Sequence, residues 1–481
     1  MLRHLLLLLL HPRAAYSTSS LRGANTWYSW LGPTNESATL AAASYMQAHL
    51  LQFGYSTYVL DEGWAEENGA LLLDANGLPT WNPRLYPAGL PALAASLRGA
   101  GLQLGVWLMR GVPREAVARK LPIAGTPFTC DQAVRFDRNC SWNGQTFGSN
   151  GSPAADAYYA ALAAKVASWG VGFLKFDCLW PHLYEGTPQT YFNEDVAGVA
   201  KAVRATPLAL SMSPGISVSP LNASAIASGA LAAMYRIAED VLDVYDSAAD
   251  GSFPQGVHQK FKKALEFEPF LGANGTWPDF DMLQVGEVVH SYGRGALPPT
   301  ETRLTPAEQA SEFALFCFTG VPLIIGGRLP LASNENGTRA LALLTQRELL
   351  AVHNGSAARA SFAPAARAFG FELYGWANTP QGAHDTRYVG VFSAGNATLG
   401  PVGAVVRFGA DAGLPGWGSA CARDLASGEW AEPVGGDVGG GVMGLTISVE
   451  AHGARSLLLT PVGDARCRTG LAGGAAAPRR A

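Results

Sequence analysis

The sequence predicts an α/β protein in which a (β/α)8 barrel is followed by a C-terminal antiparallel β-sandwich. Short apolar segments alternate with amphipathic ones as far as about residue 350. After about residue 356 short strands with glycine-rich turns take over. The chain has 481 residues, too many for one ordinary domain, and its 48% hydrophobic content can fill a large core.

Eight apolar segments in the first part have the length and composition of strands, and helical segments separate most of them. The expected strands are Trp27–Leu31, Tyr55–Trp64, Leu102–Arg110, Val171–Cys178, Leu208–Ser213, Met234–Ala238, Asp279–Leu283 and Val321–Ile325. Eight strands separated by helices favour a closed barrel over an open sheet.

Two helices of this part have marked ends. Ser152 and Pro153 can cap and open a helix that Gly170 closes. The run Thr305–Glu308 is a capping-box pattern with proline at the first helical position.

The C-terminal part is expected to contain five clear strands and to form an antiparallel β-sandwich. They are Phe371–Trp376, Arg387–Phe392, Ala404–Phe408, Leu445–Glu450 and Arg455–Thr460. The expected organisation is a signal or targeting segment over 1–24, the barrel over 25–355, the sandwich over 356–468 and a disordered tail over 469–481.

Charge and hydropathy limit the expected partners. The 34 basic and 38 acidic side chains give a net charge of −4, and no basic block occurs, so no nucleic-acid partner is expected. The longest apolar run, Leu5–Leu10, is too short to span a bilayer, so no membrane insertion is expected. The oligomeric state is left open.

The expected compartment is extracellular or vacuolar/lysosomal, reached through the secretory pathway. The Leu5–Leu10 run follows Arg3 and His4 and resembles a signal-peptide core. Arg13 breaks the small-residue cleavage pattern, so an organellar transit peptide is the alternative. Glycosylation sequons favour the secretory route, and they lie at Asn35, Asn139, Asn150, Asn222, Asn274, Asn336, Asn354 and Asn396.

The six cysteines fit an oxidising compartment without requiring one. Cys421 and Cys467 could pair, and Cys317 has the surroundings of a buried free thiol. No Cys-x-x-Cys motif or histidine cluster has metal-ligand spacing, so neither a metal nor another cofactor is expected.

Polar side chains gather where the expected strands end, which is where (β/α)8 barrels carry their functional residues. Lys175 and Asp177 stand two apart and therefore share one face of a strand. The others are Trp30, Asp61, Glu62, Trp107, Arg110, Ser211, Ser213, Arg236, Asp240, Asp279 and Asp281. Carboxylates, cations and tryptophans around one opening are typical of a sugar site. Glu239 and Asp243 are expected to be only solvated loop residues or helix caps.

Seven motifs in this part follow one another in the order found in one family. They are Trp27–Trp30, Tyr58–Trp64, Gly101–Trp107, Trp169–Asp177, Tyr235–Asp240, Trp277–Leu283 and Pro322–Gly327. Through them the chain resembles glycoside hydrolase family 27, the α-galactosidase and α-N-acetylgalactosaminidase family. The resemblance covers residues 25–355, and the C-terminal sandwich agrees with it.

The resemblance implies a retaining glycosidase that hydrolyses terminal α-D-galactosides by double displacement. Asp177 resembles the family's nucleophile and Asp240 its general acid/base, with carboxyl groups about 5–5.5 Å apart. Lys175 and Arg236 are the cations beside them. The other implied substrate-binding residues are Trp30, Asp61, Glu62, Trp107, Ser213 and Asp281. The family also implies a disulfide from Cys178 to Cys130 or Cys140.

Two departures from the family pattern leave the sugar open. Glu62 stands where the family usually has aspartate, and its extra methylene would narrow the space for a C6 hydroxymethyl, favouring β-L-arabinopyranose. Ser213 lies in the strand where α-galactosidases place a glutamate, and a small residue there could admit a 2-acetamido group. The segment from Val112 to Phe147, which includes Trp142, could line the pocket. A non-catalytic sugar-binding protein is the alternative of another class.

Overall fold

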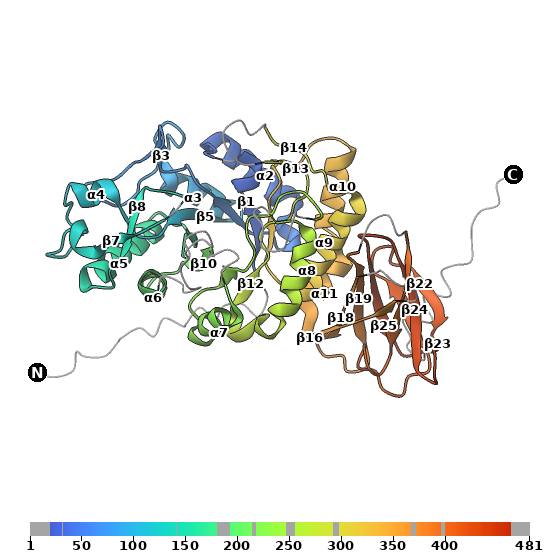
Figure 1. The fold of residues 1–481 in the computed structure, drawn as a ribbon. Helices are drawn as coiled ribbons and strands as arrows, with labels where there is room; N and C mark the ends of the chain where they lie inside the picture. The colour runs from blue at the N-terminus through green and yellow to red at the C-terminus, as the bar shows by residue number, and fades with distance from the viewer. Residues whose placement is uncertain are drawn as a thin grey trace, which may run out of the picture.

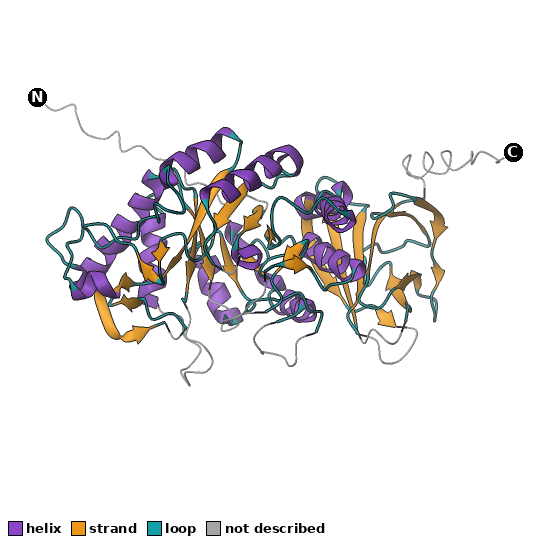
Figure 2. Ribbon diagram, turned by 90° about the horizontal axis from the view of Figure 1, so that it is seen from above, coloured by secondary structure: helices purple, strands orange, loops and turns teal. Residues whose placement is uncertain are grey.

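The computed structural model describes residues 20–30, 32–140, 142–179, 193–213, 218–246, 255–291, 298–366, 372–395 and 400–462. Figure 1 shows strands surrounded by helices in the N-terminal part of the chain and antiparallel strands in the C-terminal part. Figure 2 shows the same two parts from above. None of the described helices is long and apolar enough to cross a membrane.

Eight parallel strands form one curled sheet in the order β12-β11-β10-β9-β5-β2-β1-β15. A parallel bridge between Leu283, just after β12, and Ile325 of β15 brings the two edges together. With helices between the strands, this is the predicted (β/α)8 barrel. The strands are β1 (Arg22–Asn25), β2 (Thr57–Leu60), β5 (Gln103–Met109), β9 (Phe173–Asp177), β10 (Ala209–Ser213), β11 (Met234–Arg236), β12 (Trp277–Asp279) and β15 (Leu323–Ile325).

Helices separate these strands along the chain. The main ones are α2 (Glu36–His49), α3 (Gly89–Gly99), α5 (Pro153–Ser168), α6 (Asn193–Val203), α7 (Pro220–Gly229), α8 (Val257–Glu266) and α9 (Pro306–Thr319), with α10 (Glu335–Leu344) and α11 (Arg347–Gly355) after β15. The predicted starts of two of them are confirmed. The Ser152 side chain caps α5, and Thr305 and Glu308 form the capping box of α9.

The first and seventh strands were predicted a few residues too late. The segment expected as the first strand forms the short helix α1 (Trp27–Trp30), because Asn25 Oδ1 accepts a hydrogen bond of 2.8 Å from Trp27 N and turns the chain. The strand is β1, so the expected boundary after residue 24 falls inside it. The seventh strand ends at Asp279, since Asp281 has a left-handed φ of 69°.

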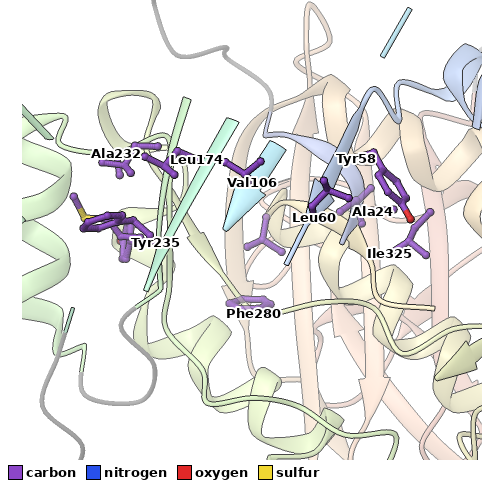
Figure 3. Close-up of a cluster of buried hydrophobic side chains, with 14 of the residues drawn as sticks. Ala24, Tyr58, Leu60, Val106, Leu174, Ala232, Tyr235, Phe280 and Ile325 are labelled. Atoms are coloured by element: carbon purple, nitrogen blue, oxygen red, sulfur yellow. The ribbon is translucent and has the colours of Figure 1, made fainter. Parts of the chain in front are cut away.

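Alternating side chains of the barrel strands fill two different cores. The interior is filled by an apolar layer that includes Val59, Phe173, Met234, Trp277 and Ile324. Their neighbours face the helices, and Figure 3 labels several of them: Tyr58, Leu174, Tyr235 and Ile325. Because the period is two, the next inward positions toward the C-terminal ends are fixed as well, and most of them are polar.

Segments between the barrel strands form three small additional sheets among the described residues. Between β5 and α5 lie β6 (Val112–Pro113), the short helix α4 (Arg114–Ala118), β7 (Val134–Asn139) and β8 (Thr146–Ser149). Two ribbons are formed by β3 (Glu66–Glu67) with β4 (Ala70–Leu71), and by β13 (Glu287–Val288) with β14 (Thr300–Glu301).

The cysteines agree with the expectations wherever the structure describes them. Cys140, after β7, forms a disulfide with Cys178, which is one of the two pairings that the family resemblance implied. Cys317 is a buried free thiol, and so is Cys130. Cys421 is disulfide-bonded, and Cys467 lies outside the described residues.

The C-terminal part contains two antiparallel sheets. The six-stranded sheet has the order β16-β18-β19-β25-β21-β22 and the four-stranded sheet the order β17-β20-β24-β23. One apolar cluster draws residues from both sheets, including Val391, Val406 and Ile447. The strands are β16 (Ser356–Phe362), β17 (Ala365–Ala366), β18 (Leu373–Pro380), β19 (Arg387–Ser393), β20 (Val402–Arg407), β21 (Ala420–Asp424), β22 (Trp430–Val434), β23 (Gly436–Asp437), β24 (Met443–Val449) and β25 (Ala454–Thr460). Each of the five expected strands overlaps one of these.

Helix α9 joins the barrel to the C-terminal sheets. Its residues from Ser311 to Thr319 are buried on every side, as expected for a helix enclosed by protein. On the sheet side, Asn378 of β18 donates a hydrogen bond of 2.8 Å to Phe318 O. Near the start of the helix, His452 lies 2.7 Å from Glu308 Oε1.

Candidate active site

The candidate site is the polar layer directly above the apolar layer of the barrel. Lys175 and Asp177 follow Phe173 at intervals of two along β9, and Arg236 follows Met234 along β11. The same spacing orients the other inward residues of this layer. They are Asn25, Asp61, Trp107, Ser213 and Asp279.

Asp177 ends β9 with each carboxylate oxygen holding one donor. Trp107 Nε1 donates to Oδ2 over 2.9 Å, and Cys178 N donates to Oδ1 over 2.7 Å. Cys178 has a left-handed φ of 60° and is tied to Cys140 by the disulfide. Behind the strand, the buried Arg110 donates its Nε to Cys178 O. The carboxylate is therefore fixed in orientation and keeps lone pairs that can meet a ligand.

Lys175 does not pair directly with Asp177. Its Nζ lies 2.7 Å from Asp61 Oδ2, which also accepts a hydrogen bond of 2.7 Å from Asn25 Nδ2. Burial lowers the pKa of Lys175, but the Asp61 and Asp177 carboxylates outweigh it and raise that pKa above its ordinary value. Lys175 therefore stays protonated and places a fixed positive charge between the two carboxylates.

Asp240 is one of the carboxyl groups of the site whose environment favours protonation. It lies after β11, 18% exposed, with Oδ1 at 2.6 Å from Arg236 NH1. Burial raises its pKa to about 6, and the nearby Asp281 and Asp177 act in the same direction, whereas Arg236 opposes them. A carboxyl group with this pKa can both give and take a proton in mildly acidic solution.

Asp281 links the backbone next to Asp240 to Tyr28 of α1. It accepts hydrogen bonds from the Tyr28 hydroxyl and, over 3.0 Å, from Val241 N. Next to it, Asp279 Oδ1 accepts from Asp281 N over 3.0 Å. Burial and the Asp281 charge raise the pKa of Asp279 to about 7, against the influence of Arg236.

Glu62 and the inserted segment meet at the rim of the site. Asn143 Nδ2 donates to Glu62 Oε1 over 3.1 Å, so the segment Val112–Phe147 contacts one of the predicted site residues. Burial, together with the charges of Glu66, Asp61 and Asp177, raises the pKa of Glu62 to about 7.

Trp142 extends this rim beside Trp107. The centroids of the two rings lie 6.5 Å apart, and the Trp142 side chain is 45% exposed. An exposed aromatic face next to Trp107 can pack against the apolar face of a sugar.

A small cavity of about 20 Å³ lies beneath the charged groups. It has room for about one water molecule. Ser213 Oγ and Arg236 Nε are buried without a hydrogen-bond partner, and both residues line it. The small side chain predicted at Ser213 therefore leaves unfilled polar space at the base of the site.

Of the predicted site residues, Trp30 is the least connected. It lies on α1, half-buried, with the Arg328 guanidinium 5.1 Å from the centre of its ring. Its role as part of the pocket wall stays a prediction. Sequence reasoning missed Asn25 and Asn143 as partners of the carboxylates, and Tyr28, although it belongs to a quoted motif.

A (β/α)8 barrel with carboxyl groups at the C-terminal ends of its strands is the arrangement found in many barrel glycosidases. No protein-family model matches the chain. The curated protein alpha-galactosidase D of Emericella nidulans is 24% identical over 342 residues, covering 68% of this chain and 41% of that protein. The chain spans about two fifths of the length of the curated relatives it matches.

Solved structures match over almost the whole chain. A GH27 β-L-arabinopyranosidase from Geobacillus stearothermophilus has a TM-score of 0.78 and 25% identity, covering 93% of this chain and 98% of that one. The α-galactosidase I of Mortierella vinacea shares the fold, with a TM-score of 0.67, 18% identity and coverages of 94% and 98%. The chain is therefore similar over almost its whole length to a solved member of glycoside hydrolase family 27.

Proposed function

We propose that the protein is a retaining exo-glycosidase that releases terminal α-D-galactose from oligosaccharides, glycolipids or polysaccharides. The observation that carries this proposal is the contrast between two carboxyl groups. Asp177 is held by two N–H donors, while burial raises the pKa of Asp240 to about 6. A retaining glycosidase uses one carboxylate as nucleophile and the other carboxyl group as acid, and the raised pKa of Asp240 suits the acid.

In the first step, Asp177 attacks the anomeric carbon while Asp240 protonates the leaving glycosidic oxygen. The C–O bond to the aglycone breaks, and an ester bond forms between the sugar and Asp177. Asp240, now ionised, takes a proton from a water molecule that attacks the same carbon. The ester bond breaks, free galactose leaves with retained configuration, and both carboxyl groups return to their starting states.

The charges of the site support this proton cycle. The Asp177 charge is among the causes that raise the pKa of Asp240. When Asp177 becomes an ester, that charge disappears and the pKa of Asp240 falls, which suits its second task as a base. The positive Lys175 and Arg236 remain in place throughout and act to lower the pKa of Asp240.

The remaining predicted residues would bind the sugar. The Asp61–Lys175 pair offers an acceptor and a donor to neighbouring hydroxyl groups, and the indole of Trp107 offers an apolar face beside Asp177. The other members of the proposed binding set are Trp30, Glu62, Ser213, Arg236 and Asp281.

A β-L-arabinopyranosidase is the second candidate, and the contact between Glu62 and Asn143 favours it. Asn143 holds the longer glutamate side chain at the rim, where it narrows the space that a C6 hydroxymethyl would need. L-Arabinopyranose has the galactose configuration without that group. The family member from Geobacillus stearothermophilus named above is a β-L-arabinopyranosidase.

The same proposal extends to the rest of the chain. The two antiparallel sheets with a common apolar cluster would form the β-sandwich expected for the family. Secretion fits sequon residues such as Asn139, Asn274 and Asn354, which are exposed, whereas Asn222 is buried.

The test is a rate comparison on three p-nitrophenyl glycosides with the parent and with Glu62→Asp. The glycosides are α-D-galactopyranoside, β-L-arabinopyranoside and α-N-acetylgalactosaminide. Fastest hydrolysis of the galactoside, with little change in the variant, supports the α-galactosidase. Fastest hydrolysis of the arabinoside, with a shift toward galactose in Glu62→Asp, supports the second candidate. No hydrolysis of any of the three, with sugar binding retained, would leave a non-catalytic sugar-binding protein.

A further inference from the structure

Asp243, three residues after Asp240, is a buried carboxylate with an unusually complete set of donors. Its side chain is 0% exposed. Arg303 N donates to Oδ2 and Arg303 NH2 to Oδ1, each over 2.7 Å, and Arg303 Nε lies 3.1 Å from Oδ1. His290 Nδ1 lies 2.7 Å from Oδ2. The expectation that Asp243 is only a solvated loop or cap residue is therefore wrong. Its partners are 47 and 60 residues away in the sequence, so no local pattern indicated them.

The partners of Asp243 belong to a ribbon that is fixed to the barrel. His290 follows β13 and Arg303 follows β14, and these two strands pair with each other. Arg328 N donates to Glu287 O over 2.8 Å, and Val289 N donates to Tyr28 O over 2.9 Å. The ribbon thus offers Asp243 a rigid attachment point.

The segment that carries Asp240 depends on such attachments. After β11 ends at Arg236, the chain follows no regular strand or helix up to Asp243. Gln255 N donates to Asp240 O over 2.9 Å, and Val241 N donates to Asp281 Oδ2. Asp243 supplies the next fixed point along the chain, so Asp240 lies between the end of β11 and this anchor.

We propose that Asp243 is a positioning residue for proton transfer by Asp240: held by Arg303 and His290, it fixes the backbone from which the Asp240 carboxyl reaches the leaving oxygen. This inference rests on the proposed function. A displacement of about 1 Å at a reacting group can slow a reaction by about 100-fold. General acid catalysis itself contributes about 10²–10⁴-fold, so loss of the anchor should be measurable.

The chain contains a matched control for this arrangement. Asp411, in the C-terminal sheets, is also buried, and Arg407 holds it in nearly the same way: Arg407 N donates to Oδ2 over 2.7 Å and NH2 to Oδ1 over 2.6 Å. The two arginine side chains are 50% and 41% exposed. Variants of the Asp411 pair therefore remove an equivalent structural interaction outside the barrel.

The experiment measures kcat/KM for two aglycones on whichever sugar the parent hydrolyses fastest. One substrate is a 2,4-dinitrophenyl glycoside, whose dinitrophenolate leaves without protonation. The other is a disaccharide, whose leaving alcohol needs a proton. We expect Asp243→Asn to lower kcat/KM for the disaccharide by about 30-fold and for the dinitrophenyl glycoside by less than about 3-fold, within the range of general acid catalysis. Asp411→Asn should leave kcat/KM unchanged for both substrates.

A second variant guards against a folding defect in the first. Arg303 is half-exposed, so guanidinium ions added to Arg303→Ala should enter the vacated position and restore disaccharide hydrolysis. They should restore nothing in Arg407→Ala. Equal losses on both aglycones, no loss in either Asp243→Asn or Arg303→Ala, or a failure of guanidinium to rescue would overturn the inference while the parent remains active. A parent inactive on every substrate overturns the proposed function instead, and this inference with it.

Discussion

Lys175 and Asp61 form a buried cation–carboxylate contact in the candidate site, with Nζ 2.7 Å from Oδ2. The two residues come from β9 and from the end of β2, which are not adjacent in the sheet. Because the ammonium is bonded to Asp61 and not to Asp177, Asp177 keeps its lone pairs while still lying in the field of the cation. In the proposed function the pair would present an acceptor and a donor to the sugar as one preorganised unit.

Replacing Asp177 by asparagine should abolish hydrolysis, because an amide cannot form the sugar ester. We expect kcat to fall by at least about 10⁴-fold, since a missing nucleophile removes the covalent route. A mechanism-based inhibitor should add its mass to a peptide that contains Asp177 in the parent only. Asp137→Asn, at an exposed aspartate of β7, is the control and should leave the rate unchanged. A variant as active as the parent would remove Asp177 from the mechanism.

The pH–rate profile should report the protonation of Asp240. Burial raises its pKa to about 6, and the general acid works only when protonated. Hydrolysis should therefore be retained below pH 6 and fall about tenfold per pH unit above it, since the protonated fraction falls by that factor. The measurement is kcat/KM for a disaccharide from pH 4 to 8. A profile that is flat up to pH 8 would contradict this assignment.

Asp279 should make the folded protein less stable as the pH rises. Burial raises its folded pKa to about 7 from an ordinary value of 3.8, so the folded state prefers the protonated form. Its contribution to stability is complete below the unfolded pKa and is lost as the pH rises through about 7. Asp279→Asn keeps an acceptor for Asp281 N and cannot ionise, so its Tm should fall less between pH 4 and 8 than that of the parent. Equal slopes in thermal melts would refute the prediction.

The disulfide should support the nucleophile as well as the fold. Cys140 and Cys178 are 38 residues apart in the sequence. A disulfide that closes a loop of this length raises the free energy of unfolding by about 3–4 kcal/mol. Because Cys178 N also binds Asp177 Oδ1, the double variant Cys140→Ser/Cys178→Ser should lose activity at temperatures where it is still folded. Chemical denaturation and rates on one glycoside would show both effects. Cys317, a buried free thiol elsewhere, has no such link to the site.

Local patterns in the sequence predicted much of the barrel and the charged residues of its C-terminal face. The period of two in β9 placed Lys175 and Asp177 on one side before any partner was known. The same reasoning failed at the first strand, since the aromatic run Trp27–Trp30 resembles a strand although Asn25 turns it into a helix. Asn25 was overlooked for this reason.

Contacts between distant segments could not be predicted in the same way. Asn143 reaches Glu62 from an inserted segment, and Arg303 reaches Asp243 across 60 positions of sequence. A carboxylate looks the same in a sequence whether water or a guanidinium surrounds it. Asp243 was misjudged because nothing within a few residues of it has a positive charge.

Helix α9 has a consequence for how this protein can be divided. One side of it completes the barrel, and the other is covered by the C-terminal sheets, with Phe318 O bonded to Asn378 and Glu308 bonded to His452. A gene truncated after residue 355 would leave that side in water, with apolar rings exposed and a buried acceptor stripped of its donor. The barrel is therefore not expected to fold by itself. Any fusion or chimaera that uses the barrel would have to include the C-terminal sheets as well.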